Sequence, residues 1–216
     1  MAESTSPPVR ERTDPIAVVS RNLHSRYPKM LIISNTELSL NDGGYEVYAK
    51  DNVIFNFKFK SSFFGPRVLL DADGNTILTF VQKKLTFGTK WIVFRGNSTK
   101  SNDIIFCTKR SSDIYPEQLD VFMGDEETED YCDFKIKGNW FDQSCTIYGT
   151  DGFTSIPGNP DIAKMIMMNP KHLSIGQEKF GVLIYPEVDH AFIVALVLIM
   201  KLTRDIDLRK HCSHGW

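Results

Sequence analysis

One stretch near the C-terminus constrains the fold more than any other part of the chain. Ala191–Met200 is a run of ten residues without a polar side chain. A surface helix keeps one polar face, so a segment that is apolar all round needs contact on every side. A bilayer-spanning helix needs about 20 apolar residues, whereas a run of about 10–14 is more typical of a helix in a protein core. We therefore expect a helix through a protein core, and no transmembrane span.

The segments before this run have the patterns of short β-strands. In Val53–Lys60, the clearest of them, Phe55, Phe57 and Phe59 fall on one face and polar side chains on the other. About a dozen such segments follow one another, separated by turn residues, which predicts a sandwich or a barrel. A helix that is apolar all round needs a closed wall. The sequence therefore predicts a mainly β protein, an antiparallel barrel that encloses its own C-terminal helix.

The 216 residues suit one domain of this kind. Residues 1–14 are polar and contain proline, and we expect them to form a disordered tail. A single barrel domain is expected over 15–207, with the central helix at about 189–204, followed by a polar tail over 208–216. Asp189 is the predicted N-cap, because its carboxylate satisfies free N–H groups and complements the helix dipole.

The N-terminus and the cysteines indicate a compartment. The first residues lack the apolar core of a secretory signal and the glycine that N-myristoylation requires. None of the four cysteines forms a Cys-x-x-Cys pair. We therefore expect an intracellular, cytoplasmic protein with reduced thiols.

No arrangement of residues points to catalysis. The chain lacks Gly-x-Ser-x-Gly, a phosphate-cradling glycine loop and His-Glu-x-x-His. The acidic run Asp125–Asp130 lacks the alternating ligands and closing glutamate of a calcium loop, so we interpret it as a solvated hairpin tip. The prediction is no enzymatic activity, no catalytic or metal-binding residues and no cofactor.

Four blocks of sequence resemble signatures of the plant LURP-one-related family. They are Arg67–Gly74, Trp91–Gly96, Cys132–Trp140 with Ser144–Tyr148 after it, and Tyr185–Ile193. The resemblance implies a fold shared with the C-terminal domain of tubby proteins and with phospholipid scramblases, a twelve-stranded barrel around a hydrophobic helix. The family is named for induction in pathogen responses, which implies a role in plant defence signalling.

The chain departs from the family pattern at two places. Ile166, Met167 and Met168 stand where basic residues are common. Lys201 follows the apolar run, where acidic residues are common. These departures argue against copying a subfamily function directly to this chain.

Tubby domains bind phosphoinositides with basic side chains on the barrel wall, so the resemblance directs attention to four lysines: Lys58, Lys60, Lys83 and Lys84. Lysines near an anionic lipid surface contribute about 1 kcal/mol each. Adjacent residues of a strand face opposite sides, so Lys83 and Lys84 both point outward only at a bulge or loop near 84–88. The alternative is that these lysines keep the strands soluble and block pairing at sheet edges.

Three functions remain open from the sequence. The first is a non-enzymatic binding or scaffold module in plant defence signalling that recognises anionic phospholipid head groups, with unknown protein partners, peripheral at the plasma membrane. The second is a scramblase-like membrane protein that handles phospholipid, against which the length of the apolar run argues. The third is a tubby-like, membrane-tethered transcription regulator. The net charge of −2 argues against this one, and we expect no nucleic-acid partner.

Overall fold

The structure is a computed structural model of the 216-residue chain. It describes residues 15–36, 44–59, 65–84, 89–111, 118–125, 131–139, 144–150, 160–168 and 178–213, except for the side chains at 59, 139, 167 and 207–213. The predicted tail over 1–14 and residues 214–216 lie outside these ranges, so nothing tests the expectation of disorder there.

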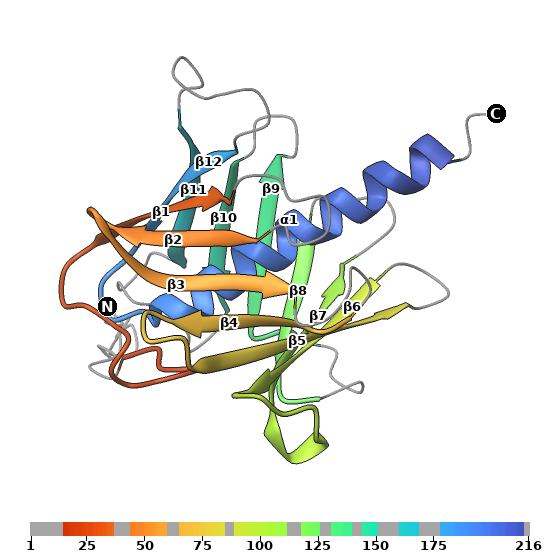
Figure 1. Ribbon diagram of the computed structural model, residues 1–216, viewed down its shortest axis with the longest axis horizontal. Coiled ribbons are helices and arrows are strands. Elements are labelled where there is room, and N and C mark those ends of the chain that lie inside the picture. The colour runs from red at the N-terminus through yellow and green to blue at the C-terminus, as the bar shows by residue number, and fades with distance from the viewer. Residues whose placement is uncertain are drawn as a thin grey trace, which may run out of the picture.

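Twelve antiparallel strands, in chain order around the wall, form a closed barrel (Figure 1). They are β1 Lys29–Asn35, β2 Tyr45–Ala49, β3 Asn52–Phe59, β4 Arg67–Asp71, β5 Thr76–Lys84, β6 Thr89–Arg95, β7 Ile104–Arg110, β8 Gln118–Met123, β9 Phe134–Asn139, β10 Ser144–Gly149, β11 Asp161–Met167 and β12 Lys179–Ile184. A short 3-10 helix, η1, covers Ser101–Asp103 between β6 and β7. The last strand pairs with the first, with Leu31 opposite Val182, and this pairing closes the wall.

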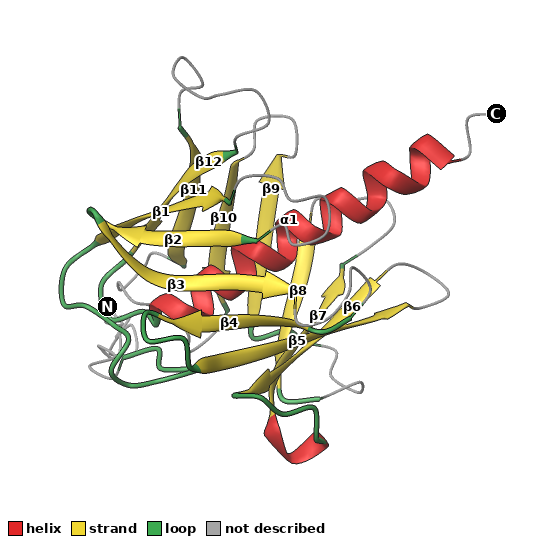
Figure 2. Ribbon diagram, in the orientation of Figure 1, coloured by secondary structure: helices red, strands yellow, loops and turns green. Residues whose placement is uncertain are grey.

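The helix α1, His190–Ser213, passes through the barrel (Figure 2). Every residue from Ala191 to Ile199 is fully buried, as the absence of polar side chains predicts. Phe192 packs edge-on against two rings of the wall, with centroid distances of 5.3 Å to Phe106 and 4.9 Å to Phe134. The predicted fold, a twelve-stranded barrel around a hydrophobic C-terminal helix, is confirmed.

The helix is longer than the sequence suggested. We placed its end at about 204 and a tail over 208–216, but α1 continues to Ser213. Polar residues after the apolar run end the burial of a helix without ending the helix itself. Lys201 and Asp205, four residues apart, also form an ion pair of 2.7 Å that supports the turn beyond the barrel.

The segment before β1 covers the N-terminal end of α1. Ile16 forms an isolated parallel bridge with Val188, and its N–H donates to the Glu187 carbonyl at 2.7 Å. Ile16 and Val19 are buried in the same core as the helix. The segment before β1 therefore lines the end of the helix and forms one bridge.

Part of the wall is also buried on its outer face. Trp91 and Val93 of β6 face the helix, whereas Ile92 and Phe94 belong to a second buried cluster with Cys107 of β7. Both faces of β6 are therefore buried, unlike those of β3, where Lys58 is exposed.

Candidate functional site

The interior of the barrel is occupied by α1, so the surfaces left for a partner are the two ends and the outer wall. At the N-terminal end, Asp189 is fully buried, and its carboxylate accepts four backbone hydrogen bonds. One oxygen accepts from Val19 at 2.7 Å and Ser20 at 2.8 Å; the other accepts from Ala191 at 2.9 Å and Phe192 at 3.2 Å. Burial raises the pKa of this carboxyl, and the four N–H groups oppose that rise. The predicted N-cap is present, and it also fastens the N-terminal segment to the helix.

His190 follows this cap and is 5% exposed. Burial, then the charges of Lys29 and His24, lower the pKa of His190 to about 4. Its imidazole is therefore neutral at neutral pH. The neighbouring His24 Nδ1 lies 2.9 Å from a carboxylate oxygen of Glu187. This end holds the helix in place, and no nucleophile lies among these contacts.

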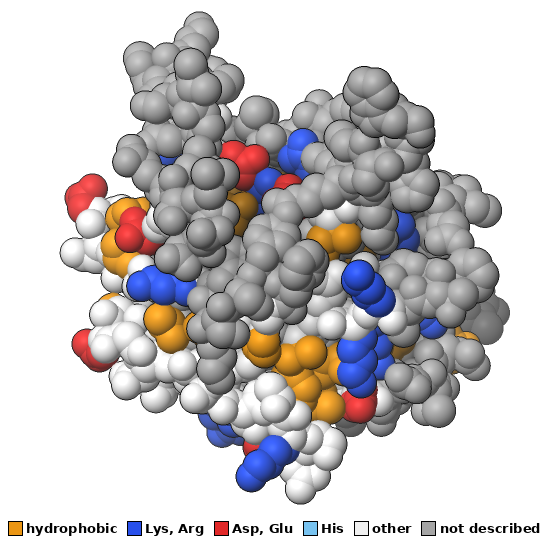
Figure 3. Space-filling view, turned by 45° about the vertical axis from the view of Figure 1, so that its right-hand side comes forward, with side chains coloured by type: hydrophobic (Ala, Val, Ile, Leu, Met, Phe, Trp, Pro, Cys, Tyr) orange, Lys and Arg blue, Asp and Glu red, His pale blue; other side chains and the backbone are white. Residues whose placement is uncertain are grey.

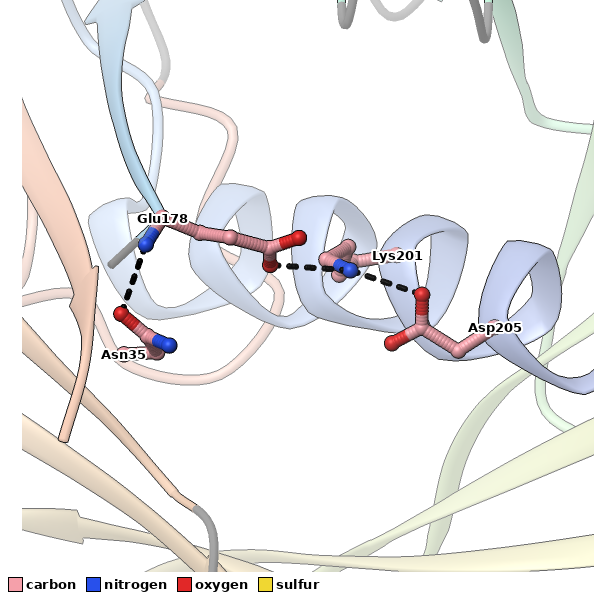
Figure 4. Close-up of polar contacts among 4 residues, drawn as sticks. All are labelled: Asn35, Glu178, Lys201 and Asp205. Carbon is pink, nitrogen blue, oxygen red and sulfur yellow. Dashed lines mark hydrogen bonds and ion pairs between the residues drawn. The ribbon is translucent and has the colours of Figure 1, made fainter. Parts of the chain in front are cut away.

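The C-terminal end carries a polar cluster where α1 leaves the wall (Figure 4). The ammonium of Lys201 lies 2.9 Å from Glu178 Oε2 and 2.7 Å from Asp205 Oδ1, and its side chain is 13% exposed. Glu178 is in turn held by its own backbone N–H, which donates to Asn35 Oδ1 at 2.8 Å. The first charge after the apolar run is thus neutralised by two carboxylates.

Two further contacts tie α1 to the wall at this end. The indole N–H of Trp91 donates to Thr203 Oγ1 at 3.0 Å, and the Thr203 hydroxyl donates to the Ile199 carbonyl at 2.8 Å. Burial, and then the charges of Glu178 and Asp205, raise the pKa of Tyr45, which therefore stays a neutral phenol. Lys201, Trp91 and Thr203 all have partners within the fold. This polar cluster therefore holds the helix in place.

The structure places three of the four lysines predicted from the sequence. Lys58 is exposed on the outer face of β3, and Lys83 and Lys84 are exposed at the end of β5. Lys60 lies outside the described residues, as do the residues after Lys84 where a bulge was considered. Because Phe80 faces the core and Val81 the outer cluster, alternation puts Lys83 on the outer face and Lys84 on the inner side at the rim.

Lys58 is not a cross-strand neighbour of Lys83 or Lys84, the other two of these lysines that the structure describes. Lys58 pairs with Val68, which pairs with Thr79, four residues before Lys83, a separation of roughly 13 Å along the strand. Lys83 pairs with Lys90, whose ammonium lies 3.4 Å from Asp125. Among the described residues on the face shown in Figure 3, basic side chains stand next to hydrophobic ones at several places. The predicted lipid-binding role of these residues stays a prediction.

A shallow open pocket of about 320 Å³ lies elsewhere, on the wall formed by β9, β10 and β11. Its lining residues are Lys137, Gly138, Ser144, Cys145, Thr146, Lys164, Met165 and Ile166. Thr146 pairs with Lys137 on one side and Lys164 on the other, so the two lysine Cα atoms are about 10 Å apart. Cys145 and Met165 belong to the core, so alternation puts Ser144, Thr146 and both lysines on the outer face.

The chemistry of this pocket suits an anion. Lys137 is exposed, and its ammonium lies 5.6 Å from the centre of the Tyr148 ring. Lys164 lies 2.7 Å from Asp161, and that hydrogen bond, with the negative charge of Asp161, raises the pKa of Lys164. The ammonium of Lys164 is therefore charged at neutral pH, and the hydroxyls of Ser144 and Thr146 add two donors. No acidic side chain is among the lining residues.

Sequence reasoning missed this pocket. Lys137 and Lys164 are far apart in the chain, and only the pairing of both strands with β10 makes them neighbours. The signal that was available is the alternation in β9, where Phe134 and Ile136 are buried and Lys135 and Lys137 face outward.

The described residues hold no group of three or more His, Cys, Asp or Glu side chains that could bind a metal ion. Burial raises the pKa of the Cys145 thiol to about 12, so this thiol is not a nucleophile at neutral pH. Within the same part of the chain, no helix combines the length and the apolar character that crossing a bilayer requires.

Comparison with known proteins identifies the family. The model of the LURP-one-related family matches residues 29–201, from the first residue of β1 into α1. The chain belongs to the LURP-one-related family. Two positions singled out in the sequence lie within or at the edge of this match: Ile166 lines the pocket, and Lys201 forms the paired cluster of Figure 4.

Relatives from Arabidopsis thaliana extend over most of this LURP-one-related chain. Protein LURP-one-related 10 is 36% identical over 86% of this chain and 95% of the relative. Protein LURP-one-related 15 is 37% identical over 85% of this chain and 83% of its own length, and protein LURP1 is 34% identical over 86% and 89%. A crystal structure of an Arabidopsis thaliana protein has a TM-score of 0.65 at 29% identity, covering 88% of this chain and 98% of that one.

Proposed function

We propose that this LURP-one-related protein is a non-enzymatic binding module of plant defence signalling that recognises anionic phospholipid head groups, phosphoinositides among them. The observation that carries the proposal is the pocket on β9–β11, where Lys137 and Lys164 flank the hydroxyls of Ser144 and Thr146 with no acidic side chain in the lining. A phosphate group between two ammonium ions receives charge-assisted hydrogen bonds, which are stronger than those between neutral groups.

The position of the pocket supports binding at a surface. It is open and lies on the outside of a barrel whose interior is filled by α1, so a head group reaches it without any movement of the wall. Asp161 neutralises part of the charge of Lys164, which keeps attraction to an anionic surface moderate and reversible. We accordingly propose a cytoplasmic protein that associates with the plasma membrane peripherally.

Lys58, Lys60, Lys83 and Lys84 remain a second proposed site for the same function. Lys58 and Lys83 are exposed on the outer wall and suit long-range attraction to an anionic surface. They line no pocket that we describe, so the pocket on β9–β11 is the stronger proposal for a specific head group. Nothing in the described residues favours the scramblase-like or transcription-regulator alternatives.

The test is co-sedimentation with phosphatidylcholine vesicles, with and without phosphoinositide. The pocket variant is Lys137→Glu/Lys164→Glu, and the wall variants are Lys58→Glu/Lys60→Glu and Lys83→Glu/Lys84→Glu. The pocket variant should bind at least about thirtyfold more weakly, since each lysine near an anionic surface contributes about 1 kcal/mol and reversal adds repulsion.

The control for charge reversal is Lys100→Glu/Lys109→Glu, at two exposed lysines away from the pocket. This variant should bind phosphoinositide vesicles nearly as well as the unmodified protein. Loss of binding only in a wall variant would move the site to β3 or β5. No vesicle binding by the unmodified protein would leave a scaffold for protein partners and refute the lipid proposal.

A further inference from the structure

An apolar patch lies beside the pocket on the outer wall. The exposed large hydrophobic side chains of the described residues are Tyr27, Met30, Tyr131, Ile166 and Met168, and three of these five meet at one place. Ile166 of β11 lies opposite Gly181 of β12, and a Cβ built at Gly181 would lie 3.3 Å from Met30 Sδ and 3.8 Å from Met168 Cγ. Met30, Ile166 and Met168 are 47%, 48% and 37% exposed.

The strand register makes this patch continuous with the pocket. Met30 pairs with Leu183, Leu183 with Lys164, Lys164 with Thr146, and Thr146 with Lys137. This row of outward side chains crosses β1, β12, β11, β10 and β9, which lie side by side in Figure 1. The row is apolar at one end and basic at the other.

β11 is the middle strand of these five and belongs to both halves. It carries Lys164 and Ile166 on the same outer face, both of which line the pocket, and Met168 follows its last residue. A lysine whose apolar stem runs beside exposed isoleucine and methionine side chains is suited to the boundary between lipid head groups and acyl chains. Lys179 of β12, two residues from Gly181 on that face, adds a basic side chain next to the patch.

We infer that Met30, Ile166 and Met168 insert into the interfacial region of an anionic bilayer while the pocket holds a head group. The inference rests on the proposed function and names its partner, an intact lipid surface, in place of a soluble phosphate. Charge complementarity selects this occupant, because the lysines beside the patch match an anionic membrane surface. Methionine side chains are flexible and adapt to an irregular apolar surface.

The experiment separates insertion from head-group binding. The variant Met30→Ser/Met168→Ser removes apolar surface of the patch and leaves every lining residue of the pocket in place. Its binding to phosphatidylcholine–phosphatidylserine vesicles (about 4:1) containing phosphoinositide should fall roughly tenfold or more, because binding scales with the apolar area that enters the interface. Binding of soluble inositol trisphosphate, measured by calorimetry, should stay unchanged.

The matched control is Tyr131→Ser, which removes an 85% exposed hydrophobic side chain at another place and should not affect vesicle binding. Unchanged vesicle binding by Met30→Ser/Met168→Ser would overturn the insertion and leave the proposed head-group site intact. Equal loss of vesicle and inositol trisphosphate binding by this variant would show that Met30 and Met168 support the head-group site, and it would also overturn the insertion. Failure of the unmodified protein to bind either probe would overturn both proposals.

Discussion

The two ends of α1 are fixed by different chemistry. At the N-terminal end, Asp189 accepts four hydrogen bonds from backbone N–H groups and is fully buried. At the C-terminal end, Lys201 meets the side chains of Glu178 and Asp205, which are 34% and 32% exposed. Backbone donors are fixed by the fold itself, whereas half-exposed charges respond to salt. The contacts at the N-terminal end therefore set where the helix begins. The strength of the ion pairs at the C-terminal end depends on the salt concentration.

The largest effect is expected at the N-terminal end. Asp189→Ala leaves buried N–H groups of Val19 and Ala191, among others, without an acceptor, at about 1–3 kcal/mol for each such group. We expect the free energy of unfolding to fall by about 3 kcal/mol or more, measured by urea denaturation. Asp189→Asn keeps one acceptor oxygen and should lie between the alanine variant and the unmodified protein. Equal stability of the alanine variant and the unmodified protein would show that the hydrogen bonds of Asp189 do not stabilise the fold.

A smaller effect is expected at the C-terminal end. Lys201→Met leaves two carboxylates facing each other, and we expect a loss of about 1–2 kcal/mol, between the values for exposed and buried ion pairs. Glu178→Gln should recover part of this loss, so the double variant should be more stable than the sum of the single effects predicts. High salt should reduce the difference in stability between Lys201→Met and the unmodified protein. Additive effects of the two substitutions would mean that the ion pair does not couple them.

A pH dependence is also expected at the N-terminal end. His190 has a pKa of about 4 in the fold, against about 6.5 when unfolded. Its contribution to stability is therefore fully present above about pH 6.5 and is lost as the pH falls toward 4. The raised pKa of Asp189 acts in the opposite sense, since that group loses stability as the pH rises. A comparison with His190→Gln isolates the histidine.

The measurement is the melting temperature between about pH 6.5 and 4. His190→Gln should lose less melting temperature over this range than the unmodified protein does. Between about pH 7.5 and 8.5 the two curves should run parallel, because the imidazole is neutral in both states there. If the melting temperatures of the two proteins also ran parallel between about pH 6.5 and 4, the lowered pKa of His190 would be contradicted.

The architecture of the barrel and its helix could be predicted from the sequence alone. Ten apolar residues in a row fix the buried helix, and the alternation of Phe55, Phe57 and Phe59 fixes a wall strand, because burial of one face leaves little choice of register. Asp189 was recognisable as a cap because the interaction is local. The end of α1 was placed too early because the change from apolar to polar residues marks the edge of the barrel, which the helix crosses.

The candidate site could not be predicted from the sequence, for a physical reason. Lys137 and Lys164 become neighbours through two strand pairings with β10, and Lys201 meets Glu178 through the closure of the barrel. Such contacts depend on which strands pair and at which residues, whereas the alternation within one strand indicates only which side chains share a face. The apolar patch was visible only as a departure, Ile166 and Met168 in place of basic residues, and its meaning required Met30 from the opposite end of the chain.

The pairing of β1 with β12 has a consequence for how the chain is made. Synthesis delivers residues from the N-terminus, so the partner of Lys29, Ile184, emerges when almost all the wall already exists. The helix that fills the interior emerges later still. For that interval the inward phenylalanines have only water or one another as neighbours, a state prone to aggregation. On the ribosome, completion of this barrel therefore waits for its last element, and the yield of folded protein depends on how the nascent strands are protected until then.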